Sequence, residues 1–279
     1  MTSLLTIPSP AVEVMPTDAT GGFLAPAPSA GLVFDLGMHR GDDTAFYLAK
    51  GFCVVAVEAN PALVAAGRRR FADEISAGQL VILNRALWAE DGARLTFHIS
   101  RANDEWSSLE AFRAEAGGQG REEVEVETVT FPGLCARYGV PRFVKCDIEG
   151  ADQHFCKQLV HAPARPDFVS IEGISLTWMA LLRAASYDRF QIVNQSRIRR
   201  SRAPLRLAAE GGAVDWQWGR HASGPFGRDL PADGWIDYDM LIIGMVGFFE
   251  QKRRFPETIF DNWMDVHATT ARALAAGAG

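Results

Sequence analysis

Short apolar runs alternate with amphipathic stretches from residue 32 onward, the pattern of a parallel sheet joined by crossover helices. Runs that are apolar throughout predict strands buried on both faces, because helices cover each side of a parallel sheet. The expected strands are residues 32–36, 53–57, 80–83, 143–146, 168–171, 190–193 and 240–243. We therefore predict an α/β fold with a doubly wound, mostly parallel, seven-stranded sheet.

Amphipathic stretches between these runs predict the crossover helices, at residues 42–50, 61–77, 151–160 and 176–186. Pro61 suits the first position of its helix, where a missing N–H costs nothing. Residues 94–99 and 122–131 alternate between apolar and polar, as half-exposed strands do. After the strand expected at 240–243 we predict a helical tail.

The chain is expected to form one domain, residues 31–279, preceded by a flexible arm, residues 1–30. The arm is rich in Pro, Ala, Thr and Ser and shows no periodicity. Residues 196–239 form a long polar stretch between two predicted strands. Insertions of this length are often functional, so we expect this one to bind the substrate.

Composition excludes several classes of partner. Of 279 residues, 48% are hydrophobic and 22% charged, and the net charge of -6 argues against general binding to nucleic acid. No apolar run is long enough to span a membrane. The four cysteines form no C-x-x-C pair, which favours free thiols in a reducing compartment and therefore a cytoplasmic location.

The segment Asp35-Leu-Gly-Met-His-Arg-Gly41-Asp-Asp-Thr44 follows the first expected strand. Ligands of open parallel sheets bind at such carboxyl ends. Gly37 permits a sharp turn, and Gly41 permits close approach of a ligand. The second strand ends at Glu58, 23 residues after Asp35, where a carboxylate can accept hydrogen bonds from two ribose hydroxyls. This pattern favours S-adenosylmethionine as the cofactor.

A dinucleotide is the rival ligand for such a strand end. It requires G-x-G-x-x-G, whereas the glycines here are spaced G-x-x-x-G. Asp42 and Asp43 would also repel a pyrophosphate at the start of the helix. We therefore prefer the methyl donor.

Residues 31–195 resemble the FkbM family of methyltransferases. The most specific match is Lys145-Cys-Asp-Ile-Glu-Gly-Ala-Asp152, similar to the family signature K-x-D-[IV]-E-G-A-[ED]. Weaker matches are Val57-Glu-Ala-Asn-Pro61, Asn84-Arg-Ala-Leu-Trp88, Ser107-Ser-Leu109, Ser170-Ile-Glu172 and Val193-Asn-Gln195. The resemblance implies a Rossmann-like class I methyltransferase that methylates a hydroxyl group of a carbohydrate, glycan or secondary metabolite.

Together the motif and the resemblance give an expected set of cofactor contacts. These are Asp35, Gly37, His39, Gly41, Thr44, Glu58, Asn60, Asn84, Ala86, Ser108 and Asp147. His39 lies in the cofactor loop, where a role in shaping the loop is the simpler interpretation. For Lys145 we favour an ion pair with a carboxylate.

Methyl transfer to oxygen needs alignment and a group that takes the hydroxyl proton. Asp147 is the first candidate for this catalytic role and Glu172 the second, while Glu149 either acts in the site or caps the next helix. Asp147, Glu172 and Asn194, at three strand ends, also suit Mg²⁺, although carboxylates there are common without a metal.

The basic run Arg197-Ile-Arg-Arg-Ser-Arg202 is either a solvated loop or a binding site for an anionic acceptor. Nearby aromatics (Trp216, Trp218, Phe226 and Trp235) suit stacking on sugar rings. Two other functions stay open, a catalytically silent cofactor-binding regulatory module and a methyltransferase acting on protein or RNA. The cluster Trp263-Met-Asp-Val-His267 is either part of a helical tail or a flap over the site.

Overall fold

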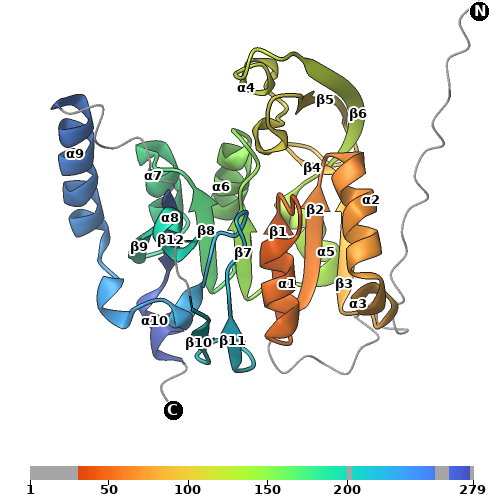
Figure 1. The fold of residues 1–279 in the computed structure, drawn as a ribbon. Coiled ribbons are helices and arrows are strands. Elements are labelled where there is room, and N and C mark those ends of the chain that lie inside the picture. The colour runs from red at the N-terminus through yellow and green to blue at the C-terminus, as the bar shows by residue number, and fades with distance from the viewer. Residues whose placement is uncertain (1–30, 200–202, 255–263, 277–279) are drawn as a thin grey trace, which may run out of the picture.

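The computed structural model describes residues 31–199, 203–254 and 264–276. Its centre is a seven-stranded sheet in the order β3-β2-β1-β7-β8-β12-β9 (Figure 1). The strands are β1 (Leu32–Leu36), β2 (Cys53–Glu58), β3 (Leu80–Asn84), β7 (Phe143–Cys146), β8 (Phe168–Glu172), β9 (Arg189–Asn194) and β12 (Met264–Thr269). The predicted α/β fold with a doubly wound, mostly parallel, seven-stranded sheet is confirmed.

The seventh strand differs from the one expected. Residues 240–243 lie in a helix, α9 (Tyr238–Arg254), and the last strand is β12, which runs antiparallel between β8 and β9. The run of apolar residues in α9 resembles a buried strand over four positions, but it continues with helical spacing over the rest of the element. The predicted helical tail around His267 is also wrong, because His267 is buried in β12. Trp263 lies outside the described residues.

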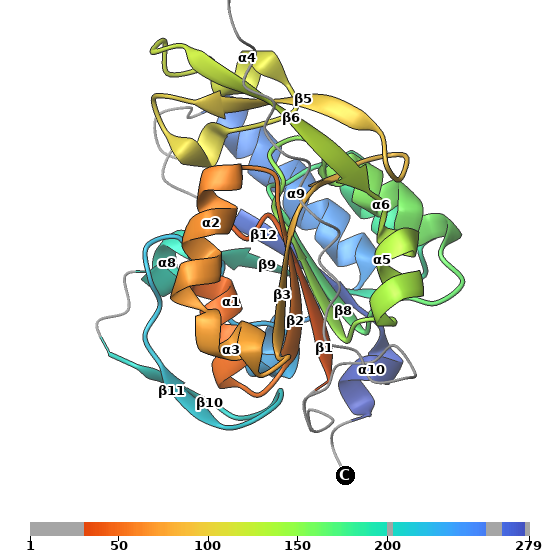
Figure 2. The same cartoon turned by 90° about the vertical axis from the view of Figure 1, so that its right-hand side faces the viewer.

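Helices cover both faces of the sheet (Figure 2). One apolar core lies between the sheet and α5 (Phe131–Tyr138), α6 (Asp152–His161), α7 (Leu176–Ala184) and α9. A second core lies on the opposite face, against α1 (Asp42–Ala49) and α2 (Pro61–Arg70). The single helix predicted over 61–77 is broken at Phe71, which separates α2 from α3 (Ala72–Ser76). Alternate residues of each strand thus face different cores.

A smaller sheet stands beside the carboxyl ends of the main strands. It has the order β4-β6-β5 and contains β4 (Ala86–Leu87), β5 (Arg94–Ser100) and β6 (Arg121–Val129). β5 and β6 are the two half-exposed strands predicted from alternation, paired antiparallel. The connection between them carries η1 (Asp104–Trp106) and α4 (Ala111–Ala114).

The stretch predicted to be a substrate-binding insertion has structure of its own. It contains α8 (Gln195–Arg199), a hairpin of β10 (Leu205–Leu207) and β11 (Val214–Trp216), and two short turns, η2 (Gly227–Asp229) and η3 (Ala232–Gly234). Trp216 and Trp218 pack on Phe46 of α1, with ring centroids 5.6 and 4.4 Å away. Phe226 stacks on Phe143 at 4.0 Å.

These contacts change the interpretation of the aromatic residues. Trp218 and Phe226 are buried in the second core, so they are not free to stack on a sugar ring. Their packing drives this segment onto α1, because each large aromatic removes an extensive apolar surface from water. Most of the segment therefore serves as a third layer that covers the outside of α1.

Some predictions fall outside the described residues, among them the N-terminal arm, 1–30, and part of the basic run at 200–202. No helix in the described ranges has the length and apolar character needed to cross a membrane. The four cysteines all lie in those ranges and are free, as predicted.

A buried ion pair fastens the insertion to α1, and it gives a first prediction. Lys50 Nζ lies 2.7 Å from Asp229 Oδ2, and neither side chain is more than 1% exposed. Asp229→Ala leaves the ammonium group buried without its partner, so we expect the free energy of unfolding to fall by about 3–5 kcal/mol. Urea denaturation measures the loss. The exposed Asp233→Ala is the matched control and should change stability by less than about 0.5 kcal/mol.

Candidate functional site

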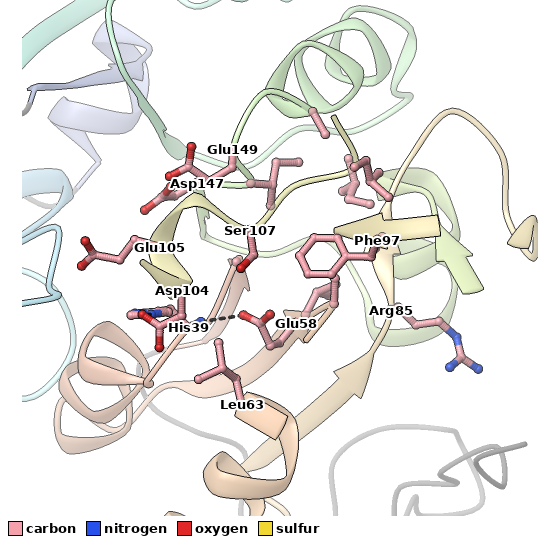
Figure 3. A pocket seen from close by; sticks show the side chains of 18 of the residues that line it. His39, Glu58, Leu63, Arg85, Phe97, Asp104, Glu105, Ser107, Asp147 and Glu149 are labelled. Carbon is pink, nitrogen blue, oxygen red and sulfur yellow. Dashed lines mark hydrogen bonds and ion pairs between the residues drawn. The ribbon is translucent and has the colours of Figure 1, made fainter. Parts of the chain in front are cut away.

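A pocket of about 820 Å³, including its open mouth, lies where β1, β2 and β7 end and the smaller sheet begins. Figure 3 shows the side chains that line it. Five of the predicted cofactor contacts are among its lining residues, namely Gly37, His39, Glu58, Ala86 and Asp147. The predicted switch-point location at the carboxyl ends of the central strands is therefore where the cavity lies.

Gly37 is required at its position by a close approach of two backbones. Its φ of +84° and the space beside it both demand glycine, since a Cβ there would lie 1.8 Å from the carbonyl oxygen of Asp147. The backbone N–H groups of Gly37 and Met38 both donate to Val57 O. This turn brings the ends of β1, β2 and β7 together on one side of the pocket.

Gly41 has a different reason from the one expected. It caps α1 with a φ of +78°, and a Cβ would meet the ring of Phe71 at 2.6 Å. Gly41 does not line the pocket, and the contact with Phe71 is by itself sufficient reason for a glycine there. The same ring marks the break between α2 and α3.

Asp35 and Thr44 lie behind the pocket. The Thr44 hydroxyl donates to Asp35 Oδ2 at 2.6 Å, and Lys145 Nζ lies 3.4 Å from the other oxygen. Asp35 is fully buried, and burial raises its pKa while the ammonium of Lys145 opposes the shift. The hydrogen bond between Asp35 and Thr44 joins β1 to α1 and so fixes the two ends of the loop 37–41.

Glu58 forms the polar floor of the pocket. Its Oε2 accepts from the backbone N–H of His39 and its Oε1 from that of Asn60, both at 2.8 Å (Figure 3 shows the first). Burial raises the pKa of Glu58 to about 7, although these two hydrogen bonds lower it. Each oxygen keeps a further lone pair for a ligand hydroxyl. Asn60 also caps α2 by accepting from Ala62 N.

Apolar side chains from the two sheets and α2 form the walls around Glu58. They are Val57, Leu63, Leu87, Phe97 and Leu109, with Ala86 among them. Asn84 does not line the pocket; its amide donates to the carbonyls of Glu58 and Ala59 and so fixes the turn. The sequence did not predict that Phe97 lines the pocket, because its strand, β5, contains no recognisable binding motif.

Ser108, the predicted cofactor contact, does not line the pocket, whereas its neighbour Ser107, for which no role was predicted, does. Ser108 is buried and donates to the carbonyl oxygen of Glu149 at 2.6 Å. Ser108 Oγ also accepts from Glu110 N. This serine joins the smaller sheet to the loop after β7.

Three carboxylates meet at the other end of the pocket. One oxygen from each of Asp147, Glu149 and Glu172 lies within 4.8 Å of the others. Asp147 and Glu149 line the pocket and Glu172 does not. Burial, together with the charge of Asp147, raises the pKa of Glu149 and Glu172. Because Asp147 lines the pocket and Glu172 does not, Asp147 is the better placed of the two candidates for the base.

Glu149 does not cap the next helix. Asp152 holds this loop instead, since its carboxylate accepts from the backbone N–H groups of Ile148 and Gly150. Glu149 has a φ of +48° and lies 3.8 Å from Arg113. Asp152, the last residue of the segment 145–152, thus shapes the loop, while Glu149 lines the pocket.

The predicted metal set of Asp147, Glu172 and Asn194 is not assembled. β12 lies between β8 and β9, so the end of β9 that carries Asn194 is not beside Glu172. The Asn194 side chain accepts from Arg197 N. A sheet in which β9 follows β8 directly would bring Asn194 beside Glu172, whereas here Met264 and Asp265 of β12 lie between them.

Lys145 links most of these elements. Its ammonium donates to Gly37 O at 2.9 Å and lies 3.4, 3.7 and 3.9 Å from carboxylate oxygens of Asp35, Asp147 and Asp43. These charges raise the pKa of Lys145 even though burial opposes the rise. The ion-pair role expected for Lys145 is confirmed by these contacts.

Residues 35–175, half of the chain, match the family model described as the methyltransferase FkbM domain. The chain belongs to this family. The protein is therefore a methyltransferase, and the family implies S-adenosylmethionine as the methyl donor. No curated protein matches the chain in sequence.

Solved structures similar to this FkbM-family protein are distant. Precorrin-6y C5,15-methyltransferase from Geobacter metallireducens is 8% identical over 88% of this chain and 82% of its own, with a TM-score of 0.38. An S-adenosylmethionine-dependent O-methyltransferase from Thermotoga maritima is 8% identical over 88% and 62%, with a TM-score of 0.34. At such values the fold class rests on the sheet order described above and on the family match.

The close approach at Gly37 gives a second prediction. Gly37→Ala and Gly51→Ala both place an alanine at φ +84°, but nothing lies within 4 Å of the Cβ at Gly51. We expect Gly51→Ala to lose about 1–2 kcal/mol of stability, from the left-handed conformation alone. Gly37→Ala should lose clearly more and should also weaken binding of S-adenosylhomocysteine. Equal losses in urea denaturation would show that the turn at Gly37 has room for a side chain.

Proposed function

We propose that this methyltransferase transfers the methyl group of S-adenosylmethionine to a hydroxyl group of a carbohydrate, glycan or secondary metabolite. The observation that carries the proposal is the polarity of the pocket. A fixed carboxylate, Glu58, lies between apolar walls at one side, and the carboxylates of Asp147 and Glu149 lie at the other.

The Glu58 side of the pocket fits a nucleoside. Leu63, Ala86, Leu87 and Phe97 offer flat apolar surface for an adenine ring, and Glu58 lies where ribose hydroxyls would donate. Because the backbone N–H groups of His39 and Asn60 already orient this carboxylate, no side-chain entropy is lost when the hydroxyls bind. Gly37 and His39 lie beside it for the methionine part of the cofactor.

The bound sulfonium supplies an electrophilic methyl group, so the protein needs only to align an acceptor and remove a proton. When the acceptor oxygen bonds to the methyl carbon, the carbon–sulfur bond would break and its electron pair would stay on sulfur. Asp147 faces the pocket and takes the hydroxyl proton. Lys145, 3.7 Å from Asp147 Oδ2, holds that carboxylate in place.

The first test is calorimetric titration with S-adenosylhomocysteine. Glu58→Gln keeps the shape of the side chain but replaces one acceptor oxygen, and we expect binding to weaken by about 1–3 kcal/mol. Unchanged affinity would remove Glu58 from the ribose site. Absence of binding by the parent protein would contradict the proposal.

The pH dependence of this binding is a third prediction. Only the ionised carboxylate offers acceptors to both hydroxyls, so affinity should rise with pH through the Glu58 pKa of about 7. Between pH 6 and pH 8 the affinity should increase about tenfold. Glu58→Gln should flatten this part of the profile, and a flat profile in the parent would contradict the assignment. Other raised acids, such as Asp43, are unchanged in the variant and serve as an internal control.

Substitution of Asp147 gives a fourth prediction. Asp147→Asn should bind S-adenosylhomocysteine normally and lose turnover by about 10²–10⁴-fold, the usual contribution of a general base. Transfer of a labelled methyl group to a panel of hydroxylated acceptors measures the loss. Glu172→Gln, which changes an acid that does not line the pocket, should retain most of the activity. The opposite ranking of the two variants would assign the base to Glu172.

A further inference from the structure

Two histidines and two carboxylates from three distant segments converge on one wall of the pocket. His39 follows β1, Asp104 and Glu105 belong to η1, and His221 follows β11. One ligand atom from each of His39, Glu105 and His221 lies within 4.8 Å of the others. Figure 3 shows Asp104 beside His39, with Glu105 close by.

The nitrogen atoms in this cluster face acidic oxygen atoms. His221 Nδ1 lies 2.5 Å from Glu105 Oε1. His39 Nε2 lies 3.3 Å from Asp104 Oδ1, and this buried nitrogen makes no well-formed hydrogen bond within the described ranges.

Other side chains already orient the carboxylates. Arg40 donates to Asp104 Oδ2 at 2.6 Å, and Asn103 donates to Glu105 Oε2 at 3.1 Å. Each acid therefore keeps its other oxygen, Asp104 Oδ1 and Glu105 Oε1, directed toward a histidine. Hydrogen bonds of this kind, made by groups outside the ligand set, fix the orientation of metal ligands in proteins.

We propose that His39, Glu105 and His221, assisted by Asp104, bind one divalent transition-metal ion of the zinc type. Imidazole and carboxylate together suit zinc, whereas magnesium prefers an all-oxygen set. Zinc bonds of about 2.0–2.2 Å in a tetrahedron place ligand atoms about 3.3 Å apart. The ligand atoms of His39, Glu105 and His221, within 4.8 Å of one another, already lie near that spacing.

Metal binding at this cluster would crosslink three segments that are far apart in the chain. η1 belongs to the smaller sheet and His221 to the layer that covers α1, while His39 sits in the cofactor loop. His39 also donates its backbone N–H to Glu58, so the ion would fix the residue that orients the pocket floor. The proposal rests on the cluster alone and does not depend on the acceptor or on catalysis.

The test titrates the untagged, chelator-treated protein with Co²⁺, a spectroscopic substitute for zinc, without cofactor. We expect one equivalent to bind with the visible absorption bands of a tetrahedral site. His221→Ala and Glu105→Gln should each weaken binding about 10–100-fold. His161→Ala removes an exposed histidine outside the cluster and should bind as the parent does. Circular dichroism checks that each variant folds.

Zinc should also raise the thermal midpoint of the parent and of His161→Ala, because it binds only the folded state. Glu105→Gln, which keeps a hydrogen-bonding group of the same size, should lose this rise. No cobalt bands in the parent would overturn the proposal and leave the cluster a hydrogen-bonded contact between segments. Equal binding by the parent and both cluster variants would show an adventitious ion only, with the same consequence.

Discussion

The site depends on one buried cation. Lys145 sits in the middle of β7, and its ammonium compensates the carboxylates of Asp35, Asp43 and Asp147, which come from β1, α1 and the end of β7. Without the ammonium these acids would repel one another in an environment that screens charge poorly. Lys145 also donates a hydrogen bond to Gly37 O, in the loop between β1 and α1. One side chain therefore contacts the ends of β1 and β7 and the turn at Gly37, and stabilises their arrangement.

From this centre the contacts run outward to the added layers. Asp43, held near Lys145, accepts the backbone N–H groups of Ser223 and Gly224, so the segment after β11 is attached to the first turn of α1. On the other side Ser108 attaches the smaller sheet to the loop of Glu149. Two additions thus border the pocket. One is tied by hydrogen bonds to α1, and the other to the loop after β7.

Local patterns were enough to predict much of this molecule. The runs at 32–36, 53–57 and 143–146 are mostly apolar, with one charged residue each at Asp35 and Lys145 in the first and third, and they form the buried strands β1, β2 and β7. Glu58 and Asp147 were placed correctly because parallel strands end at the same edge of a sheet. His221 and Glu105 were missed, since they come together only through the packing of segments more than a hundred residues apart. A pattern within one short segment cannot predict a contact between side chains so far apart in the sequence.

The errors at the C-terminal side have the same origin. Residues 240–243 satisfy the composition of a strand, yet they lie in α9, with Leu241 and Met245 packed into the core one helical turn apart. The last strand is instead Met264–Thr269. Its polar residues, such as Asp265 and His267, interrupt the apolar pattern that would predict a buried strand. These polar side chains are buried by the neighbouring strands, which a periodicity argument does not foresee.

The position of β12 has a consequence for how the protein is made. In the described ranges β9 pairs along its length with β12 and otherwise makes a single bridge, from Phe190 to Ile236, and β12 also covers one edge of β8. During synthesis both edges stay open for the roughly 70–90 residues between these strands and β12, and open edges are prone to pair with other chains. The sheet can be completed only after Thr269 has left the ribosome. Folding of this half is therefore governed by long-range contacts and is expected to be slow.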